Sequence, residues 1–143
     1  MNGLIYFLSA CSFALVFISC DRNPTQPEND SNLLNTDVFS SKTTARFDHF
    51  AHDFGDIKEG QKVEHLFTFV NSGSKDLLII SAEGSCGCTV PEFPKDPVKP
   101  GESSQIKVVF NSKGRKGPQI KTVKVIANTN DPLTELIIKA NVI

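Results

Sequence analysis

The residues in this sequence with the clearest capacity for chemistry are two cysteines separated by one glycine, Cys86-Gly87-Cys88. In a straight strand, residues two apart share a face with Cα atoms about 6.5–7 Å apart, at or beyond the limit for a disulfide. Gly87 permits a kink that would close this gap. Cys86 and Cys88 are therefore candidates for a disulfide or for a metal-binding site.

Three interpretations of this pair stay open. In the first, the pair is structural, either as small buried side chains or as a local disulfide that pins the loop after the apolar run Leu77–Ala82. In the second, the thiolates bind a metal, because two soft ligands suit Cu(I), or zinc with two further ligands. The third is thiol–disulfide exchange, although the usual redox motif has two intervening residues at the start of a helix.

The histidines His49, His52 and His65 are the only ones in the chain, and no spacing ties them to the cysteines. His65 shares a strand face with Phe67 and Phe69, which predicts a hydrogen-bonded core or rim residue. We expect His49 and His52 to lie at the surface beside the first strand. No nucleophile elbow, phosphate-binding loop, zinc-protease motif or dinucleotide fingerprint occurs, so we expect no catalytic residues, no cofactor and no enzyme activity.

The N-terminal segment has the pattern of an export signal. The apolar run Leu4–Ile18 is too short to span about 30 Å of hydrocarbon but suits the core of a signal peptide. It ends at Ser19-Cys20, which resembles the lipobox of bacterial lipoproteins. The resemblance implies a signal peptide over 1–19, cleavage before Cys20 and a lipid anchor on Cys20 that makes the membrane a partner. An uncleaved anchor and simple secretion remain alternatives.

A second lipobox-like sequence ends at Cys11, but cleavage there would leave an apolar tail on the mature protein. After Cys20 the chain is rich in Asn, Asp, Ser, Thr and Pro. Such a segment buries too little apolar surface to offset its ordering entropy. We therefore expect residues 20–45 to be a lipidated, flexible tether.

The body of the chain, 46–143, predicts a single all-β domain. Apolar and polar residues alternate in short runs that are separated by turn formers such as Asn71-Ser72-Gly73 and Pro100-Gly101. Several short strands in this length favour an immunoglobulin-like antiparallel β-sandwich. The alternation predicts a buried core that includes Phe67, Phe69, Ile79, Val108, Val123, Val125 and Ile138. The continuous apolar run Leu77–Ala82 predicts a buried strand.

Several motifs in fixed order resemble the bacterial family known as domain of unknown function 1573. They are His52–Ile57, Gly60, Phe67–Asn71, Ser85–Thr89, Pro100–Glu102, Ile106–Val108 and Asn111. The resemblance covers 46–143 and implies an immunoglobulin-like fold akin to the abnormal-spindle and hydin domains. It also implies a lipoprotein of a Gram-negative cell envelope, and we expect the outer membrane. It implies no specific activity.

Charge and composition narrow the function further. The chain has 143 residues, a net charge of −1 and 22% charged residues, which argues against nucleic acid as the main partner because phosphate binding needs a concentrated positive field. A local basic patch at Lys113, Arg115, Lys116, Lys121 and Lys124 suits either an envelope polymer or a solvated hairpin that discourages edge pairing. We therefore expect a non-enzymatic binding or scaffolding lipoprotein with an unknown protein or envelope-polymer partner. The alternative is a thiol redox or copper-handling protein acting through Cys86 and Cys88.

Overall fold

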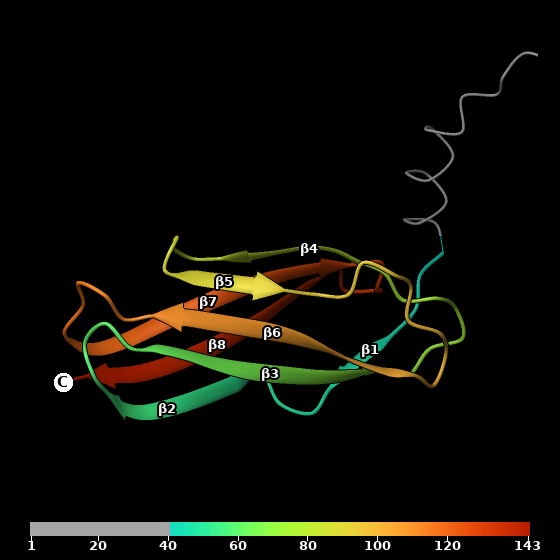
Figure 1. Cartoon of the computed structure of the whole chain (residues 1–143). Coiled ribbons are helices and arrows are strands. Elements are labelled where there is room, and N and C mark those ends of the chain that lie inside the picture. Colours follow the sequence, from blue (N-terminus) through green and yellow to red (C-terminus); the bar gives the residue numbers. More distant parts are fainter. Residues whose placement is uncertain (1–40) are drawn as a thin grey trace, which may run out of the picture.

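The computed structural model describes residues 41–143, which fold into β-strands without any helix in this part of the chain (Figure 1). No segment described could therefore cross a membrane as a long apolar helix. The predicted signal peptide over 1–19 and the predicted lipidation site Cys20 lie outside the described residues. The strands are β1 (Ala45–Phe47), β2 (Ala51–Ile57), β3 (Lys62–Asn71), β4 (Ile79–Gly84), β5 (Thr89–Glu92), β6 (Ser103–Asn111), β7 (Gly117–Ala127) and β8 (Leu133–Val142).

These strands form two four-stranded sheets that pack face to face (Figure 1). One sheet has the order β1-β3-β6-β5 and the other has the order β2-β8-β7-β4. Neighbouring strands are antiparallel, except that β2 runs parallel to β8. The predicted all-β sandwich is therefore confirmed.

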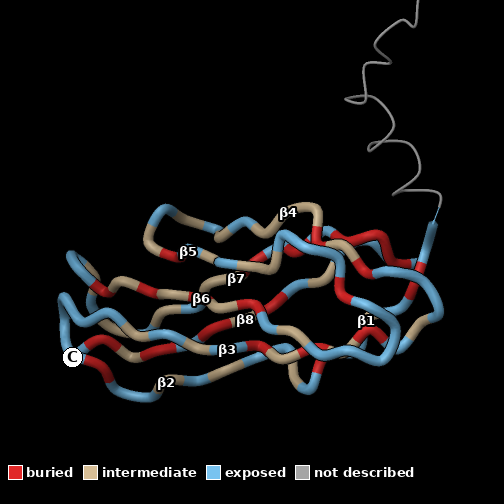
Figure 2. The backbone as a smooth tube through the Cα atoms, turned by 45° about the vertical axis from the view of Figure 1, so that its right-hand side comes forward, coloured by how far each residue is buried: buried red, intermediate tan, exposed pale blue. Residues whose placement is uncertain are grey.

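The core lies between the sheets and follows from the alternation of side chains along each strand (Figure 2). In β3 the side chains of Phe67 and Phe69 are fully buried, whereas Leu66 on the other face is 44% exposed. Every core residue predicted from the sequence is buried: Phe67, Phe69, Ile79, Val108, Val123, Val125 and Ile138.

Two interpretations of sequence patterns were wrong because they depended on which strands become neighbours. The run Leu77–Ala82 is only partly buried, because β4 is the edge strand of its sheet: Leu77 and Ile79 are buried, and the other four residues are half-buried. The basic patch does not protect an edge hairpin, because β6 and β7 lie in different sheets and β7 is an interior strand. Two of its lysines, Lys121 and Lys124, stand on this interior strand.

The sandwich begins earlier than the predicted end of the tether. Ala45 opens β1, and Thr43 is only 3% exposed. The Thr43 amide donates to the carbonyl of Asn128 at 3.0 Å, and its hydroxyl donates to Oδ1 of Asn71 at 2.9 Å. Residues 41–45 therefore belong to the folded domain, because these polar side chains have partners that are distant in sequence.

Candidate functional site

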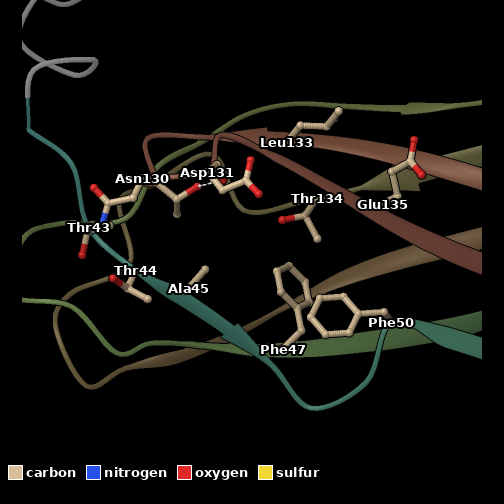
Figure 3. A pocket seen from close by; sticks show the side chains of 11 residues that line it. Thr43, Thr44, Ala45, Phe47, Phe50, Asn130, Asp131, Leu133, Thr134 and Glu135 are labelled. Carbon is tan, nitrogen blue, oxygen red and sulfur yellow. Dashed lines mark hydrogen bonds between the residues drawn. The ribbon is translucent and has the colours of Figure 1, made fainter.

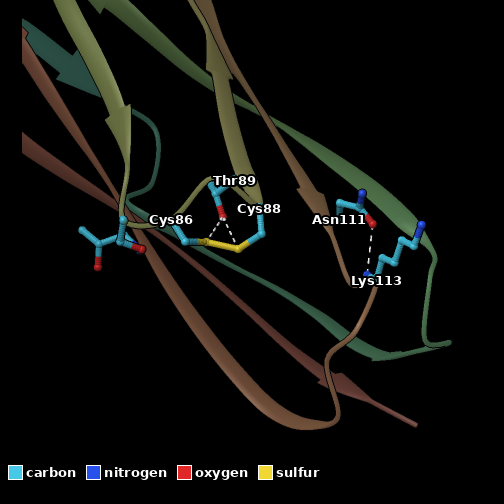
Figure 4. The surroundings of a disulfide bond; sticks show 7 residues. Cys86, Cys88, Thr89, Asn111 and Lys113 are labelled. Carbon is cyan, nitrogen blue, oxygen red and sulfur yellow. Dashed lines mark hydrogen bonds between the residues drawn. A yellow bond between two sulfur atoms is a disulfide. The ribbon is translucent and has the colours of Figure 1, made fainter.

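The Cys-Gly-Cys turn connects the end of β4 to the start of β5 (Figure 4). Cys86 and Cys88 form a disulfide with their Cα atoms 5.2 Å apart, which is closer than in a straight strand. Both cysteines are half-buried. Gly87 is not among the glycines with positive φ, so the turn brings the sulfurs together without a left-handed backbone.

Backbone hydrogen bonds fix this turn to both sheets. The Thr89 amide donates to the Cys86 carbonyl at 3.0 Å, and the Asn111 amide of β6 donates to the Cys88 carbonyl at 2.9 Å. On the other side, the Ser85 amide donates to the carbonyl of Thr122 in β7 at 2.8 Å. The Thr89 hydroxyl lies 3.6 Å from Sγ of Cys86 and 3.8 Å from Sγ of Cys88. The turn thus joins the two sheets at one edge of the sandwich. Both of its cysteines are oxidised in the disulfide, so neither carries a free thiol.

The structure separates the histidines from the cysteines. β4 and β5, which flank the disulfide, are edge strands on one side of the sandwich, whereas β1 and β2 are the edge strands on the opposite side (Figure 1). His52 lies in β2 and His65 lies in β3, beside β1. Within residues 41–143, no group of three or more His, Cys, Asp or Glu side chains is arranged to hold a metal ion. A zinc site that combines histidines with the cysteines is therefore not supported.

The three histidines instead form one cluster, which we call the histidine cluster. Nε2 of His49 lies 2.7 Å from Nε2 of His65, and the His52 ring stacks on the His65 ring with centroids 3.7 Å apart. The expectation that His49 and His52 lie at the surface was wrong, because both are half-buried and face His65. Burial lowers the pKa of His65, and the nearby His52 and His49 lower this pKa further.

A pocket of about 440 Å³ lies between β1 and the start of β8, and we call it the β1/β8 groove (Figure 3). Phe47 and Phe50 line one side, and Leu133, Thr134 and Glu135 line the other. Phe50 and Leu133 are 52% and 45% exposed, so the groove presents two large apolar side chains to solvent.

The edge of β8 is open along this groove. β2 pairs with β8 only from Ile137 onward, and β1 pairs with β3 in the other sheet. Residues 133–136 therefore have β7 as a partner on one side and no strand of the described chain on the other. An unpaired stretch of strand backbone is a template for an added strand.

Sequence reasoning did not identify the groove or the histidine cluster. No pattern of neighbouring residues marks Phe50 as exposed. The local signal for the cluster was the alternation that places His52 and Phe54, and likewise His65 and Phe67, on inward faces. That alternation does not indicate that the inward face of β2 packs against the inward face of β3, because the two strands belong to different sheets.

Comparison with solved structures defines the class of protein. A protein of unknown function from Porphyromonas gingivalis W83 has a TM-score of 0.63 and 16% identity, with 77% of this chain and 51% of that chain covered. The ASH or PapD-like domain 7 of human CEP192 has a TM-score of 0.55 and 10% identity, with 71% and 87% covered. At such identities the likeness shows the fold alone, which is an immunoglobulin-like, PapD-like β-sandwich and confirms the predicted fold class.

The chain aligns with parts of larger proteins as well. The secreted serine protease VesC from Vibrio cholerae has a TM-score of 0.50 and 13% identity, with 74% of this chain and 24% of that chain covered. This chain therefore spans about half of the Porphyromonas gingivalis chain and about a quarter of VesC. A search of curated proteins finds no match to this sequence.

Residues 45–142 match the family model described as "Protein of unknown function (DUF1573)", and the chain belongs to this family. The resemblance drawn from the sequence motifs is thereby confirmed. The family description assigns no activity. Neither the comparisons nor the geometry of the described residues supports a redox or copper-handling function for Cys86 and Cys88.

Proposed function

We propose that this chain is a non-enzymatic lipoprotein of a Gram-negative cell envelope, anchored through Cys20 in the outer membrane, whose sandwich binds another protein. The support for export and anchoring is the sequence of the N-terminal segment. The support for binding is the β1/β8 groove, where two exposed apolar side chains adjoin an open strand edge.

The groove suits an extended peptide segment of a partner protein. In strand addition, the backbone of the added peptide bonds to a free sheet edge, and pockets receive its alternate side chains. The open stretch at 133–136 supplies the edge, and the rings of Phe47 and Phe50 supply an apolar wall. Glu135 and Asp131 border the groove and favour a segment that carries a basic side chain.

Site-directed photocrosslinking in the cells that produce the protein tests this proposal. A photoreactive amino acid at Leu133, inside the groove, is expected to give a discrete crosslinked product with one protein partner. The matched control is the same amino acid at Leu66, which is similarly exposed but lies on the outer face of β3. Introducing Phe50→Ser into the Leu133 variant is expected to reduce the crosslinked product strongly.

Equal products from positions 133 and 66, or no product from 133, would contradict binding in the groove. Circular dichroism of the Phe50→Ser variant checks that the sandwich remains folded. Phe50 is more than half exposed, so its replacement removes little core packing.

A further inference from the structure

The histidine cluster joins the two sheets at one edge of the sandwich. His49 lies in the connection between β1 and β2, His52 lies in β2, and His65 lies in β3. β2 and β3 belong to different sheets, so the contacts among these rings cross the interface. Every histidine of the chain takes part.

The contact between His49 and His65 requires a neutral ring. Their Nε2 atoms are 2.7 Å apart, and one of them must donate a proton while the other accepts it. A protonated imidazole has two donors and no acceptor. The bond therefore tolerates at most one positive charge on this pair, and protonation of both rings breaks it.

The third ring adds to this charge dependence. His52 stacks on His65 with an interplanar angle of 7° and centroids 3.7 Å apart. Phe54 meets His52 edge-on at 4.5 Å, and Phe67 meets His65 edge-on at 4.8 Å. At this half-buried site, two stacked imidazolium rings would repel each other more strongly than in bulk water.

Among residues 41–143, no carboxylate faces the histidine cluster to compensate a positive charge. On the elements that carry the histidines, Asp48, Asp53 and Glu64 occupy exposed positions that alternate with the inward-facing rings. On the packed strands, Val108 of β6 lies opposite His65 and Ile138 of β8 lies opposite His52.

The cations on these packed strands also point away. Lys139 of β8 is exposed between the inward-facing Ile138 and Ala140. Lys107 of β6 lies on the outer face and pairs with Glu92 at 2.8 Å. The charges that lower the pKa of His65 come from the other two imidazoles, after the larger effect of its burial.

We propose that the histidine cluster is a proton-operated latch that holds β2 and the preceding connection, 48–50, against β3 at neutral pH and releases them on acidification. Release loosens one edge of the sandwich while the core between the central strands remains packed. Phe50 lies in the released connection and lines the β1/β8 groove, so the same event alters one wall of that groove. The latch itself does not depend on what the groove binds.

The direction of the pH effect follows from linkage. Burial keeps the pKa of His65 in the folded protein below the value of 6.5 for an unperturbed histidine. As the pH falls through 6.5, the unfolded or opened state takes up a proton before the closed state does. The stability that the latch contributes is therefore fully present above pH 6.5 and is lost as the pH falls from 6.5 toward the folded-state pKa.

Amide hydrogen exchange of the full chain at about pH 7.5 and about pH 5 tests the latch. The protection of each amide is its intrinsic exchange rate at that pH divided by its observed rate, which removes the direct effect of pH on exchange. The reporters are the amide of Asp48, which donates to the Thr68 carbonyl at 3.1 Å, and the amide of Ile137, which donates to the Phe50 carbonyl at 2.8 Å. We expect protection of both amides to fall about fivefold at the lower pH, which corresponds to one lost hydrogen bond. The amide of Ser85 at the opposite edge is expected to keep its protection.

The variant His65→Phe keeps an aromatic ring against its neighbours but has no titrating group. Its protection at Asp48 and Ile137 is expected to be the same at both pH values. The variant His49→Gln offers a second test. The side-chain amide of the glutamine can still form a hydrogen bond with His65, but it cannot take up a proton. The control variant Glu83→Gln, on β4, is expected to respond to pH as the wild-type chain does.

Equal protection of the reporter amides at both pH values in the wild-type chain would overturn the latch. So would a pH response that persists in both His65→Phe and His49→Gln. Histidine titration by nuclear magnetic resonance gives an independent measure, since three ordinary and uncoupled titrations would also overturn it.

Discussion

At the residue scale, the side chain of Asn71 organises the end of the sandwich at which the described chain begins. Its amide nitrogen donates to the carbonyls of Lys75 at 2.7 Å and Val98 at 2.9 Å. Its amide oxygen accepts from the Thr43 hydroxyl at 2.9 Å and from the Gly73 amide at 3.1 Å. Asn71 is fully buried and its bonds to Thr43 and Val98 are buried too, so these two partners have little access to water if the amide is removed.

We expect Asn71→Ala to lower the free energy of unfolding by at least about 2 kcal/mol, because it removes four hydrogen bonds made by a fully buried amide and leaves the buried Thr43 hydroxyl without this partner. Chemical unfolding of the purified protein measures the change. The matched control is Asn141→Ala, whose amide makes one exposed hydrogen bond, to Oδ1 of Asp56 at 2.8 Å. This control is expected to cost less than about 1 kcal/mol. Similar losses in the two variants would contradict the role assigned to Asn71.

At the scale of elements, the two glycines beside Cys86 differ in what surrounds them. A Cβ added to Gly84, at the end of β4, would collide with the carbonyl oxygen of Thr89 in β5. A Cβ added to Gly87 would meet nothing within 4 Å. The close approach of β4 and β5 therefore requires glycine at 84 and not at 87.

We expect Gly84→Ala to destabilise the protein by about 1–3 kcal/mol, because the two strands must move apart. Gly87→Ala is expected to change stability by no more than about 0.5 kcal/mol. Thermal unfolding of both variants with the disulfide intact measures the difference. A larger effect at 87 than at 84 would show that the chain path through the turn is wrong.

The strand β3 carries two of the three fully buried phenylalanines in the described core. Phe67 and Phe69 are fully buried, and the Phe69 ring packs against Phe47 of β1 with centroids 5.3 Å apart. We expect Phe69→Ala to cost about 3–5 kcal/mol, a large share of the stability of a small domain. Leu66→Ala, on the outer face of the same strand, is the matched control and is expected to cost much less. Chemical unfolding that ranks Leu66→Ala above Phe69→Ala would contradict the assignment of faces.

At the scale of the whole molecule, the N-terminal segment predicts where the sandwich is held. If Cys20 carries the lipid, Cys20→Ala is expected to release the protein from the membrane fraction or to leave its precursor uncut. The physical reason is that more than one acyl chain is needed for stable anchoring, and the lipobox-like cysteine is where they would be attached. Membrane fractionation and the mass of the mature protein measure this. Cys11→Ala is the control, and unchanged retention of the Cys20→Ala variant would contradict the anchor.

The fold class and most of the core followed from the sequence, because strand burial is a local property. Alternation along β3, β6, β7 and β8 predicts which residues face inward, and this prediction does not depend on which strands are neighbours. The sequence did not predict that β4 is an edge strand or that the β6–β7 connection passes from one sheet to the other. Both features depend on the order of strands in the sheets. The family motifs supported the same fold and did not indicate a functional site.

By itself, the sequence determined the alternating core, the close spacing of Cys86 and Cys88, and the export-like N-terminus, which are all read within a few neighbouring residues. Only the tertiary structure decided that the disulfide and the histidines lie on opposite edges, and that His49 meets His65 across 16 positions of sequence. It also decided that β8 is left open beside Phe50. The physical reason is that such contacts arise from pairing between distant strands, and this pairing is selected by the packing of the whole core rather than by any local pattern.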